Sequence, residues 1–307
     1  MTAPRTMDPA RQPHFRRPGV CHAPKIAVFV KYEFWVNYLL AMKRAGTKLY
    51  LISSIFRDGQ IFFRPYGGLF RSALRAFRHI FVQNDSSRNL LKSIGIEQVS
   101  VAGDTRFDRV YEIAQQAKRL PEIERFAADA PVFIAGSTWP PDEELLVGLI
   151  ERYPDVKFIV APHEIDPARI EKFCERISRP ALRYTQLTPQ SDLAAAGVLF
   201  VDTIGILSSV YRYGRWGYIG GGFGAGIHNT LEAATFGLPL AFGPRYGKFR
   251  EARDLVTLRG AASIASAEEL ERWFAGLHDD PDATGRSGTI CKEYVLQHKG
   301  ATARIMD

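Results

Sequence analysis

Short apolar runs alternate with helical patterns from residue 26 onward, and this alternation restricts the fold of the chain more than any other feature. In its first part the alternation predicts four strands: IAVFV (26–30), KLYLIS (48–53), HIFVQN (79–84) and QVSVAG (98–103). Stretches with helical spacing separate them, for example NYLLAMKRAG (37–46) and SSRNLLKSIG (86–95). Strands that alternate with helices are typical of βαβ units, so we predict a parallel sheet.

A second series of the same kind begins after residues 112–131, a polar stretch without a strand pattern that suits a linker helix. It predicts five more strands: PVFIAGS (131–137), VKFIVAP (156–162), GVLFVD (197–202), WGYIGGG (216–222) and LPLAFG (238–243). A chain of 307 residues with 46% hydrophobic content can bury the cores of two domains. We therefore predict the α/β class, with two doubly wound, Rossmann-like domains, the first of which has few strands for such a sheet.

The two ends of the chain differ from the middle. Residues 1–25 are rich in Pro and Arg and show no periodicity, so we expect them to be disordered. The rest is expected to divide into a partial N-terminal domain (26–125), a C-terminal domain (126–290) and a final helix that crosses back (291–307).

Cysteine content and hydropathy exclude several classes. The three cysteines show no metal-type spacing and predict neither a disulfide framework nor a metal site. No apolar run approaches the ~18 residues that a membrane span requires. We expect a cytoplasmic chain without a transmembrane segment.

The net charge of +7 favours an anionic partner, which can be nucleic acid, a phosphorylated ligand or an acidic membrane surface. Within residues 64–80, three arginines and three apolar side chains recur at helical spacing: Arg71, Arg75, Arg78, Phe70, Leu74 and Phe77. This pattern is compatible with a solvated basic helix face and with a helix that lies on an anionic membrane.

The segment GGGFGAGIHNTLEAATFGLP (220–239) follows a predicted strand and enters a helical pattern. Glycines such as Gly221 and Gly222 allow a ligand to approach the backbone, and a helix N-terminus offers N–H groups to an anion. Glu232 could accept hydrogen bonds from sugar hydroxyls. The alternative is a Gly-rich turn in which Asn229 is an ordinary N-cap.

Two other strands of the second series also end in polar residues, where open α/β sheets bind ligands. Ser137 and Thr138 could hold a phosphate, or they could simply begin a helix together with the prolines and acids that follow. His163 could face the same ligand, or it could be a loop histidine satisfied by its surroundings.

In the first series, Glu33 comes just past a strand and Arg57 comes just past the next one. Glu33 could position a hydroxylated ligand, or it could be a capping acid. Arg57 could be a fixed cation at the site, or it could be solvated.

No phosphate-loop lysine motif, first-strand GxGxxG, HExxH or nucleophile elbow is present. Hydride transfer, ATP hydrolysis and metalloprotease chemistry are therefore disfavoured. A cleft with a backbone anion site, a carboxylate for sugar hydroxyls and nearby cations would suit a sugar-nucleotide transferase.

Four segments resemble, in order, the motifs of one enzyme family. KYEFWVN (31–37) resembles TELWPN, VAGDTRFD (101–108) resembles GNLKFD, IAGSTWPPDEE (134–144) resembles AASTHEGEE, and GGGFGAGIHNTLEAATFGLPLAFGP (220–244) resembles GGSLVxxGGHNPLEPAxxGxPVxxGP. From about residue 26 to its end, the chain is thus similar to the 3-deoxy-D-manno-octulosonic acid (Kdo) transferases of lipopolysaccharide biosynthesis. The resemblance implies the two-domain GT-B glycosyltransferase fold, with the first domain incomplete.

The resemblance also implies a reaction: transfer of Kdo from CMP-Kdo to a lipid A precursor, without a cofactor or a metal in the transfer step. It implies a peripheral location at the cytoplasmic face of the inner membrane, with that membrane surface as a partner and no nucleic acid. The implied donor residues are Ser137, Thr138, His163, Gly221, Gly222, Asn229 and Glu232. Glu33 would lie on the transfer side of the cleft, and Arg57 would face the acceptor or its phosphates.

The chain departs from the family pattern at three places. APHEI (161–165) lacks the arginine of the family's PRH segment, and Gly205, Ile206 and Leu207 lack the acid of its GEL segment. Residues 1–24 match neither the family's membrane anchor nor its general-base glutamate. We therefore expect a truncated member, or one whose start is misplaced, with little or no transferase activity.

Two other functions compete with this one. The chain could be a non-catalytic module that binds a CMP-sugar or a membrane surface, in which case Met1 would be the true start. It could also be another GT-B transferase that uses a UDP-sugar, which only the resemblance disfavours.

Overall fold

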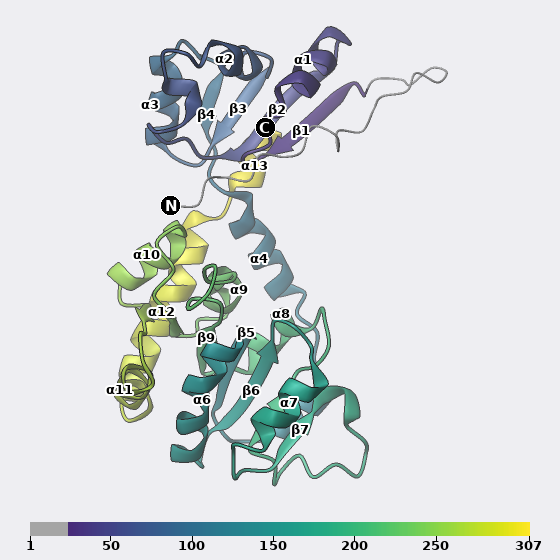
Figure 1. Ribbon diagram of the computed structural model, residues 1–307, viewed down its shortest axis with the longest axis vertical. Helices are drawn as coiled ribbons and strands as arrows, with labels where there is room; N and C mark the ends of the chain where they lie inside the picture. The colour runs from purple at the N-terminus through teal and green to yellow at the C-terminus, as the bar shows by residue number, and fades with distance from the viewer. Residues whose placement is uncertain (1–23) are drawn as a thin grey trace. The chain divides into compact units, whose positions relative to one another are not determined.

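The computed structural model describes residues 24–307, and the chain divides into two units after Val101. The disorder expected for residues 1–25 falls almost entirely outside the described residues. Both units are α/β with parallel sheets, so the predicted fold class is confirmed (Figure 1).

The first unit contains a four-stranded sheet whose spatial order, β1-β2-β3-β4, repeats the order in the chain. The strands are β1 (Ile26–Val30), β2 (Lys48–Ser54), β3 (His79–Val82) and β4 (Val99–Val101). Their connections contain α1 (Val36–Arg44), the 3₁₀ helix η2 (Ile61–Phe63), α2 (Gly68–Leu74) and α3 (Asp85–Ser93). All four strands predicted for this part of the chain are confirmed.

Within residues 24–101, the connecting helices of this sheet pack on one of its faces. Parallel crossovers are right-handed, so a sheet that grows in one direction places all its connecting helices on the same side. Leu51 and Ile80 point to that side and are fully buried. Side chains alternate between the faces of a strand, and in β1 the residues of the other face stay exposed: Ile26 by 57%, Val28 by 55% and Val30 by 45%. We call this the open face.

The second unit contains a seven-stranded parallel sheet in the order β11-β10-β9-β5-β6-β8-β7. Its strands are β5 (Val132–Thr138), β6 (Lys157–Pro162), β7 (Ala181–Arg183), β8 (Val198–Phe200), β9 (Trp216–Ile219), β10 (Leu240–Phe242) and β11 (Ala261–Ser263). The five predicted strands are confirmed. The sequence does not predict β7 and β11, which are short and contain mainly small or long polar side chains.

The second unit also contains helices, several of which lie beside its sheet (Figure 1). They are α4 (Thr105–Gln115), α5 (Pro121–Ala127), α6 (Pro140–Arg152), α7 (Pro167–Cys174), α8 (Leu207–Val210), α9 (Thr230–Thr235), α10 (Arg250–Thr257), α11 (Ala267–His278), α12 (Pro281–His298) and α13 (Ala301–Met306), with 3₁₀ helices η3 (Tyr184–Gln186) and η4 (Tyr211–Tyr213). The sheet starts in its middle at β5 and grows both ways, which places crossovers on both faces. Two apolar clusters result: one contains Ile134 and Ile159, and the other contains Phe133 and Phe158.

The observed division after Val101 differs from the boundary expected after residue 125. The reason is that the segment from α4 to α5 packs on the second unit, where the Leu120 N–H donates to the Tyr213 hydroxyl (2.7 Å). The end of the chain is anchored to α4 as well, because Asp108 accepts hydrogen bonds from the Gly300 and Thr302 N–H groups. That the last helix crosses back to the first domain stays a prediction.

Within residues 24–307, every helix is too short or too polar to cross a membrane.

Candidate functional site

The strand order of the second unit indicates where a ligand would bind. The sheet reverses its direction of growth at β5, which has β6 on one side and β9 on the other. Open α/β sheets bind ligands at the carboxyl ends of the strands that flank such a switch point. Ser137 and Thr138 end β5, and Gly220, Gly221 and Gly222 follow β9, so five residues of the glycine-rich and Ser-Thr segments meet at this edge. We call it the donor edge.

The three glycines are required by backbone packing. A Cβ on Gly222 would lie 2.5 Å from Gly243 Cα, and one on Gly220 would collide with the Ser137 carbonyl. Gly221 has φ +92°, and a Cβ there would lie 2.5 Å from the Gly226 carbonyl oxygen. The glycines therefore let the loop after β9 pass between the ends of β5 and β10. The sequence left open ligand approach or a Gly-rich turn, and it did not indicate this close approach of the backbones.

Asp142, in the first turn of α6, holds the donor edge together. It is fully buried, and its carboxylate accepts hydrogen bonds from the N–H groups of Trp139 and Gly221 (both 2.9 Å) and from the Tyr218 hydroxyl (2.7 Å). Burial and the neighbouring Asp142 raise the pKa of Tyr218, so this hydroxyl stays protonated and donates. Sequence reasoning treated Asp142 only as a helix-start acid. Its partners lie up to 79 residues away in the chain, so no local signal could reveal them.

Three aromatic rings are packed together at the same edge. The Trp139 indole N–H donates to His228 Nε2 at 3.0 Å, and the ring of His163 stacks against both neighbours. The ring centroid of His163 lies 4.7 Å from that of Trp139 and 4.2 Å from that of His228. His163 is exposed and the other two are half-buried. The predicted site residue His163 is thus part of a ring cluster that the sequence did not indicate.

The hydrogen bond from Trp139 requires an unprotonated Nε2 on His228. Burial, and then the neighbouring His163, lower the pKa of His228. His228 is therefore neutral at physiological pH and carries its proton on Nδ1, because Nε2 accepts. The cluster presents flat rings next to the glycine-rich loop.

A second polar chain starts at Thr138. Its hydroxyl donates to the Glu143 carboxylate at 3.1 Å, and Arg169 from α7 lies 3.5 Å from the same carboxylate oxygen. Burial raises the pKa of Glu143, although Arg169 and Thr138 act in the opposite direction. Ser137 is half-buried with φ +55°, an uncommon backbone conformation for a residue with a side chain.

Asn229 and Glu232 lie at the start of α9. Asn229 is the N-cap, and its side-chain oxygen accepts from the Leu231 N–H at 3.2 Å. Its amide nitrogen donates to Glu232 at 2.9 Å. The capping alternative is therefore confirmed, and the same geometry fixes the Glu232 carboxylate, which is half-buried.

The other two predicted site residues lie in the first unit. Glu33 is exposed in the turn between β1 and α1, and Arg57 is exposed after β2, with its N–H bonded to Gln60. They follow the carboxyl ends of neighbouring strands, as expected.

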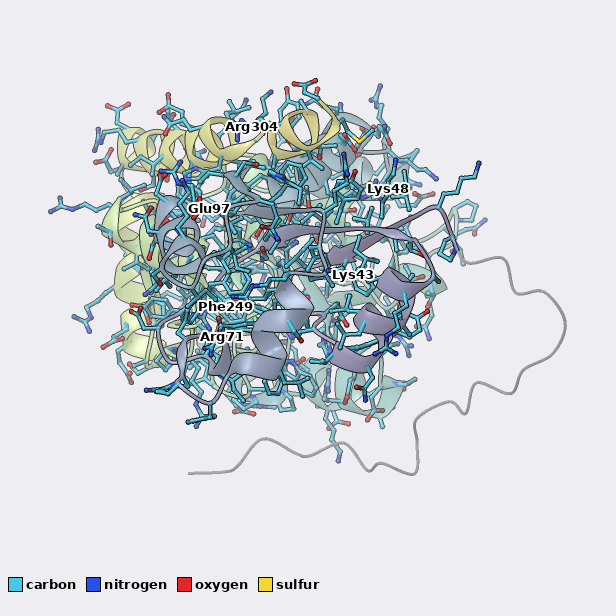
Figure 2. The ribbon with its side chains drawn as sticks, turned by 90° about the horizontal axis from the view of Figure 1, so that it is seen from above. Lys43, Lys48, Arg71, Glu97, Phe249 and Arg304 are labelled. Atoms are coloured by element: carbon cyan, nitrogen blue, oxygen red, sulfur yellow. The ribbon has the colours of Figure 1, made fainter. Side chains whose placement is uncertain are left out.

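The basic helix pattern at residues 64–80 has a structural explanation. Helix α2 ends at Leu74, and both Leu74 and Phe77 are buried in the core of the first unit, so this apolar stripe does not face a membrane. The Arg71 guanidinium donates to the carbonyls of Phe62, Arg64 and Pro65, and Lys43 donates to the Arg75 carbonyl; Figure 2 labels Arg71 and Lys43. The interpretation as a helix lying on a membrane by this stripe is wrong.

Two parallel sheets, with a ligand edge at the switch point of the second, define the GT-B class of glycosyltransferase folds, and comparison with solved structures confirms it. The chain aligns over 62% of its length with 99% of the C-terminal CMP-Kdo binding domain of WaaA from Acinetobacter baumannii (22% identity, TM-score 0.51). Over 92% of its length it aligns with 70% of a UDP-N-acetylglucosamine 2-epimerase (12% identity, TM-score 0.61). At these identities the comparison concerns the fold.

Sequence comparisons identify the family that this chain resembles. Residues 15–109 match the family model described as 3-deoxy-D-manno-octulosonic-acid transferase (kdotransferase). The chain is 25% identical over 300 residues to the 3-deoxy-D-manno-octulosonic acid transferase of Bordetella pertussis, covering 93% of this chain and 69% of that protein. The enzyme of the same name from Rickettsia bellii is 25% identical over 80% of this chain and 60% of its own length. The resemblance to Kdo transferases is confirmed, and the chain spans about two thirds of the relatives it matches.

Proposed function

We propose that this chain is a glycosyltransferase of the kind that moves Kdo from CMP-Kdo to a lipid A precursor; that it has little or no transferase activity stays a prediction. The observation that carries the proposal is the donor edge: residues predicted to bind the nucleotide, from three separate segments, lie at or after the ends of strands β5, β6 and β9 around one switch point. They are Ser137, Thr138, His163, Gly221, Gly222, Asn229 and Glu232. The similarity to Kdo transferases supports CMP-Kdo as the donor.

The donor edge suits a sugar nucleotide in three ways. Glu232, fixed by Asn229, offers a carboxylate that can accept hydrogen bonds from sugar hydroxyls. The ring cluster offers a flat surface for a base, and stacking on aromatic rings stabilises bases by about 1–3 kcal/mol each. The tip of the glycine-rich loop, at Gly224 and Ala225, is exposed, so its backbone could meet a phosphate, whereas Gly221 and Gly222 are buried.

Transfer would require acceptor groups from the first unit. In the proposed reaction, an acceptor hydroxyl forms a bond to the anomeric carbon of Kdo, the bond from that carbon to the CMP phosphate oxygen breaks, and the hydroxyl proton passes to a base. Glu33 is an exposed carboxylate at the end of β1 and Arg57 an exposed cation after β2, which suits them to the acceptor and its phosphates.

The charge distribution supports binding of an anionic acceptor or membrane by the first unit. Residues 24–101 contain twelve Lys and Arg against four Asp and Glu, a formal charge of +8, whereas residues 102–307 contain 24 against 28, a charge of −4. The first unit also exposes aromatic side chains, including Trp35 by 61% and Tyr66 by 77%. Basic charge beside exposed aromatic rings is typical of a peripheral contact with an anionic membrane, here the cytoplasmic face of the inner membrane.

Calorimetric titration with CMP tests the donor site. We expect the chain to bind CMP and the Glu232→Ala variant to bind it more weakly, while a Glu144→Ala control, at an exposed ion pair with Arg176, binds normally. A folded wild-type chain that binds no CMP would contradict the proposal. An assay of Kdo transfer to a lipid A precursor then separates the enzyme from the alternative, a non-catalytic CMP-sugar-binding or membrane-surface module.

A further inference from the structure

An anionic nucleotide meets an unfavourable charge balance at the second unit. This unit has a formal charge of −4, and Asp142, Glu143, Asp202 and Glu232 all lie near the carboxyl ends of its strands. Long-range attraction therefore does not favour binding of a phosphate here. A cation held at the donor edge itself would therefore stabilise a bound phosphate.

Two arginines of this unit already pair with a carboxylate. Arg169 lies 3.5 Å from Glu143, and Arg183 lies 2.9 Å from Asp202. Hydrogen bonds from Thr185 and Arg183 lower the pKa of Asp202 despite its burial. This carboxylate therefore stays charged and paired with Arg183. His228 is neutral because burial lowers its pKa.

Arg245 differs from these residues. It follows β10, the strand next to β9, and within residues 24–307 it forms no ion pair with a carboxylate. Its N–H donates to the Gly222 carbonyl (2.9 Å), and its Nη1 donates to the Gly224 carbonyl (2.7 Å). The exposed guanidinium is thus fixed against the tip of the glycine-rich loop. Since a guanidinium has five N–H donors, this contact leaves others for a ligand, and the positive charge is not neutralised.

We propose that Arg245 binds the phosphate of the donor nucleotide and braces the glycine-rich loop that lies beside it. The inference rests on the proposed function, because it assigns a residue to the same donor site. Arg245 would supply a cation at this site, where the APHEI segment has no arginine. The ligand class is a nucleoside monophosphate or the monophosphate part of a nucleotide sugar, recognised by a charge-assisted hydrogen bond.

Two substitutions separate the effect of the positive charge of Arg245 from the effect of its hydrogen bond to the Gly224 carbonyl. Arg245→Gln removes the positive charge, but its amide can still donate to the Gly224 carbonyl, whereas Arg245→Lys keeps the charge. We expect Arg245→Gln to weaken CMP binding about tenfold or more, the effect of one charge-assisted hydrogen bond, and Arg245→Lys to retain most of the affinity. Cytidine has no phosphate, so its affinity, measured by competition with CMP, should be the same for the wild type and for Arg245→Gln.

Arg250→Ala is the matched control, because Arg250 is an exposed arginine on α10 that pairs with Asp254, and this variant should bind CMP like the wild type. Calorimetry with CMP, competition by cytidine and circular dichroism for folding make the measurements. Unchanged CMP affinity in Arg245→Gln, or an equal loss of CMP and cytidine binding, overturns the phosphate assignment alone. Failure of the folded wild type to bind CMP overturns the proposed function as well.

Discussion

The two sheets of this protein are both parallel, but they differ in how they bury their surfaces. The sheet β5–β11 grows from its middle in both directions and has an apolar cluster on each face. The sheet β1–β4 grows in one direction, and β1 leaves Ile26, Val28 and Val30 about half exposed on its open face. Chain connectivity thus decides both the number of covered faces and the presence of a switch point where a ligand can bind.

The two sheets also differ in the free energy that side-chain burial contributes to folding. Parallel sheets are normally buried on both faces, and full burial of a Val or Ile side chain contributes about 1.5–3 kcal/mol. The open face forfeits about half of that contribution at each of three positions. The second sheet should therefore tolerate truncation of its side chains much less well than the open face does.

Phenylalanine truncation should produce the largest difference. Phe158 in β6 is fully buried against Phe133, whereas Phe81 in β3 is half-buried and points to the open face. We expect Phe158→Ala to lower the free energy of unfolding by about 3–5 kcal/mol and Phe81→Ala to cost much less. Urea unfolding of both variants makes the measurement, and equal losses would show that something covers the open face.

A glycine substitution tests the crowded edge of the second sheet. A Cβ on Gly222 would lie 2.5 Å from Gly243 Cα, while one on Gly224 would have its nearest neighbour at 3.6 Å. Gly222→Ala should lower the free energy of unfolding by about 1–3 kcal/mol and reduce CMP binding, because the backbones must move apart. Gly224→Ala is the control and should change little. Normal stability of Gly222→Ala would contradict the close approach of these loops.

Acid should weaken both units through one histidine in each. Burial lowers the pKa of His79 in the first unit and of His228 in the second from the usual value of 6.5. A histidine with a lowered pKa contributes stability that is present above its unfolded pKa and lost as pH falls through its folded pKa. Below pH 6.5 the free energy of unfolding should thus decrease, and His228→Gln should reduce this dependence.

Trp139 reports the same event locally, because protonation of His228 Nε2 ends its hydrogen bond with the indole N–H. Tryptophan emission should therefore change as pH falls below 6.5 in the wild type. Trp139→Phe provides the control for the three other tryptophans. If the difference in emission between the wild type and Trp139→Phe does not change as the pH falls below 6.5, the hydrogen bond from Trp139 to His228 is contradicted.

The smallest effect on stability is expected on the open face. Replacing Ile26, Val28 and Val30 together by Thr should lower the free energy of unfolding by only about 1–2 kcal/mol in total, since each position is about half exposed and Thr keeps one methyl group. It should also reduce binding of a dye that detects exposed apolar surface. Val160→Thr in β6 is the matched control on a covered strand and should destabilise clearly. A large loss in the triple variant would mean that the open face is buried in solution.

Much of the fold was visible in local patterns. Nine strands were predicted because short runs of β-branched and aromatic residues favour a strand, and such a run is visible within a few residues. The polar residues at the ends of those strands indicated the donor edge. The edge strands β7 and β11 were missed because Ala-Leu-Arg and Ala-Ala-Ser show no such preference. For Asn229 the sequence left open an N-cap or a residue on the nucleotide side of the site; the structure confirms the N-cap, and the second role stays a prediction.

The sequence by itself determined the α/β class, the resemblance to Kdo transferases and the segments that form the donor edge, because these follow from periodicity and from short motifs. Only the tertiary structure decided that Asp142 ties α6 to the glycine loop, that Trp139, His163 and His228 pack as one cluster, and that Arg245 braces Gly224. It also decided that one sheet keeps an open face. These features depend on contacts between segments far apart in the chain. Strand order sets those contacts, and no local sequence pattern predicts strand order.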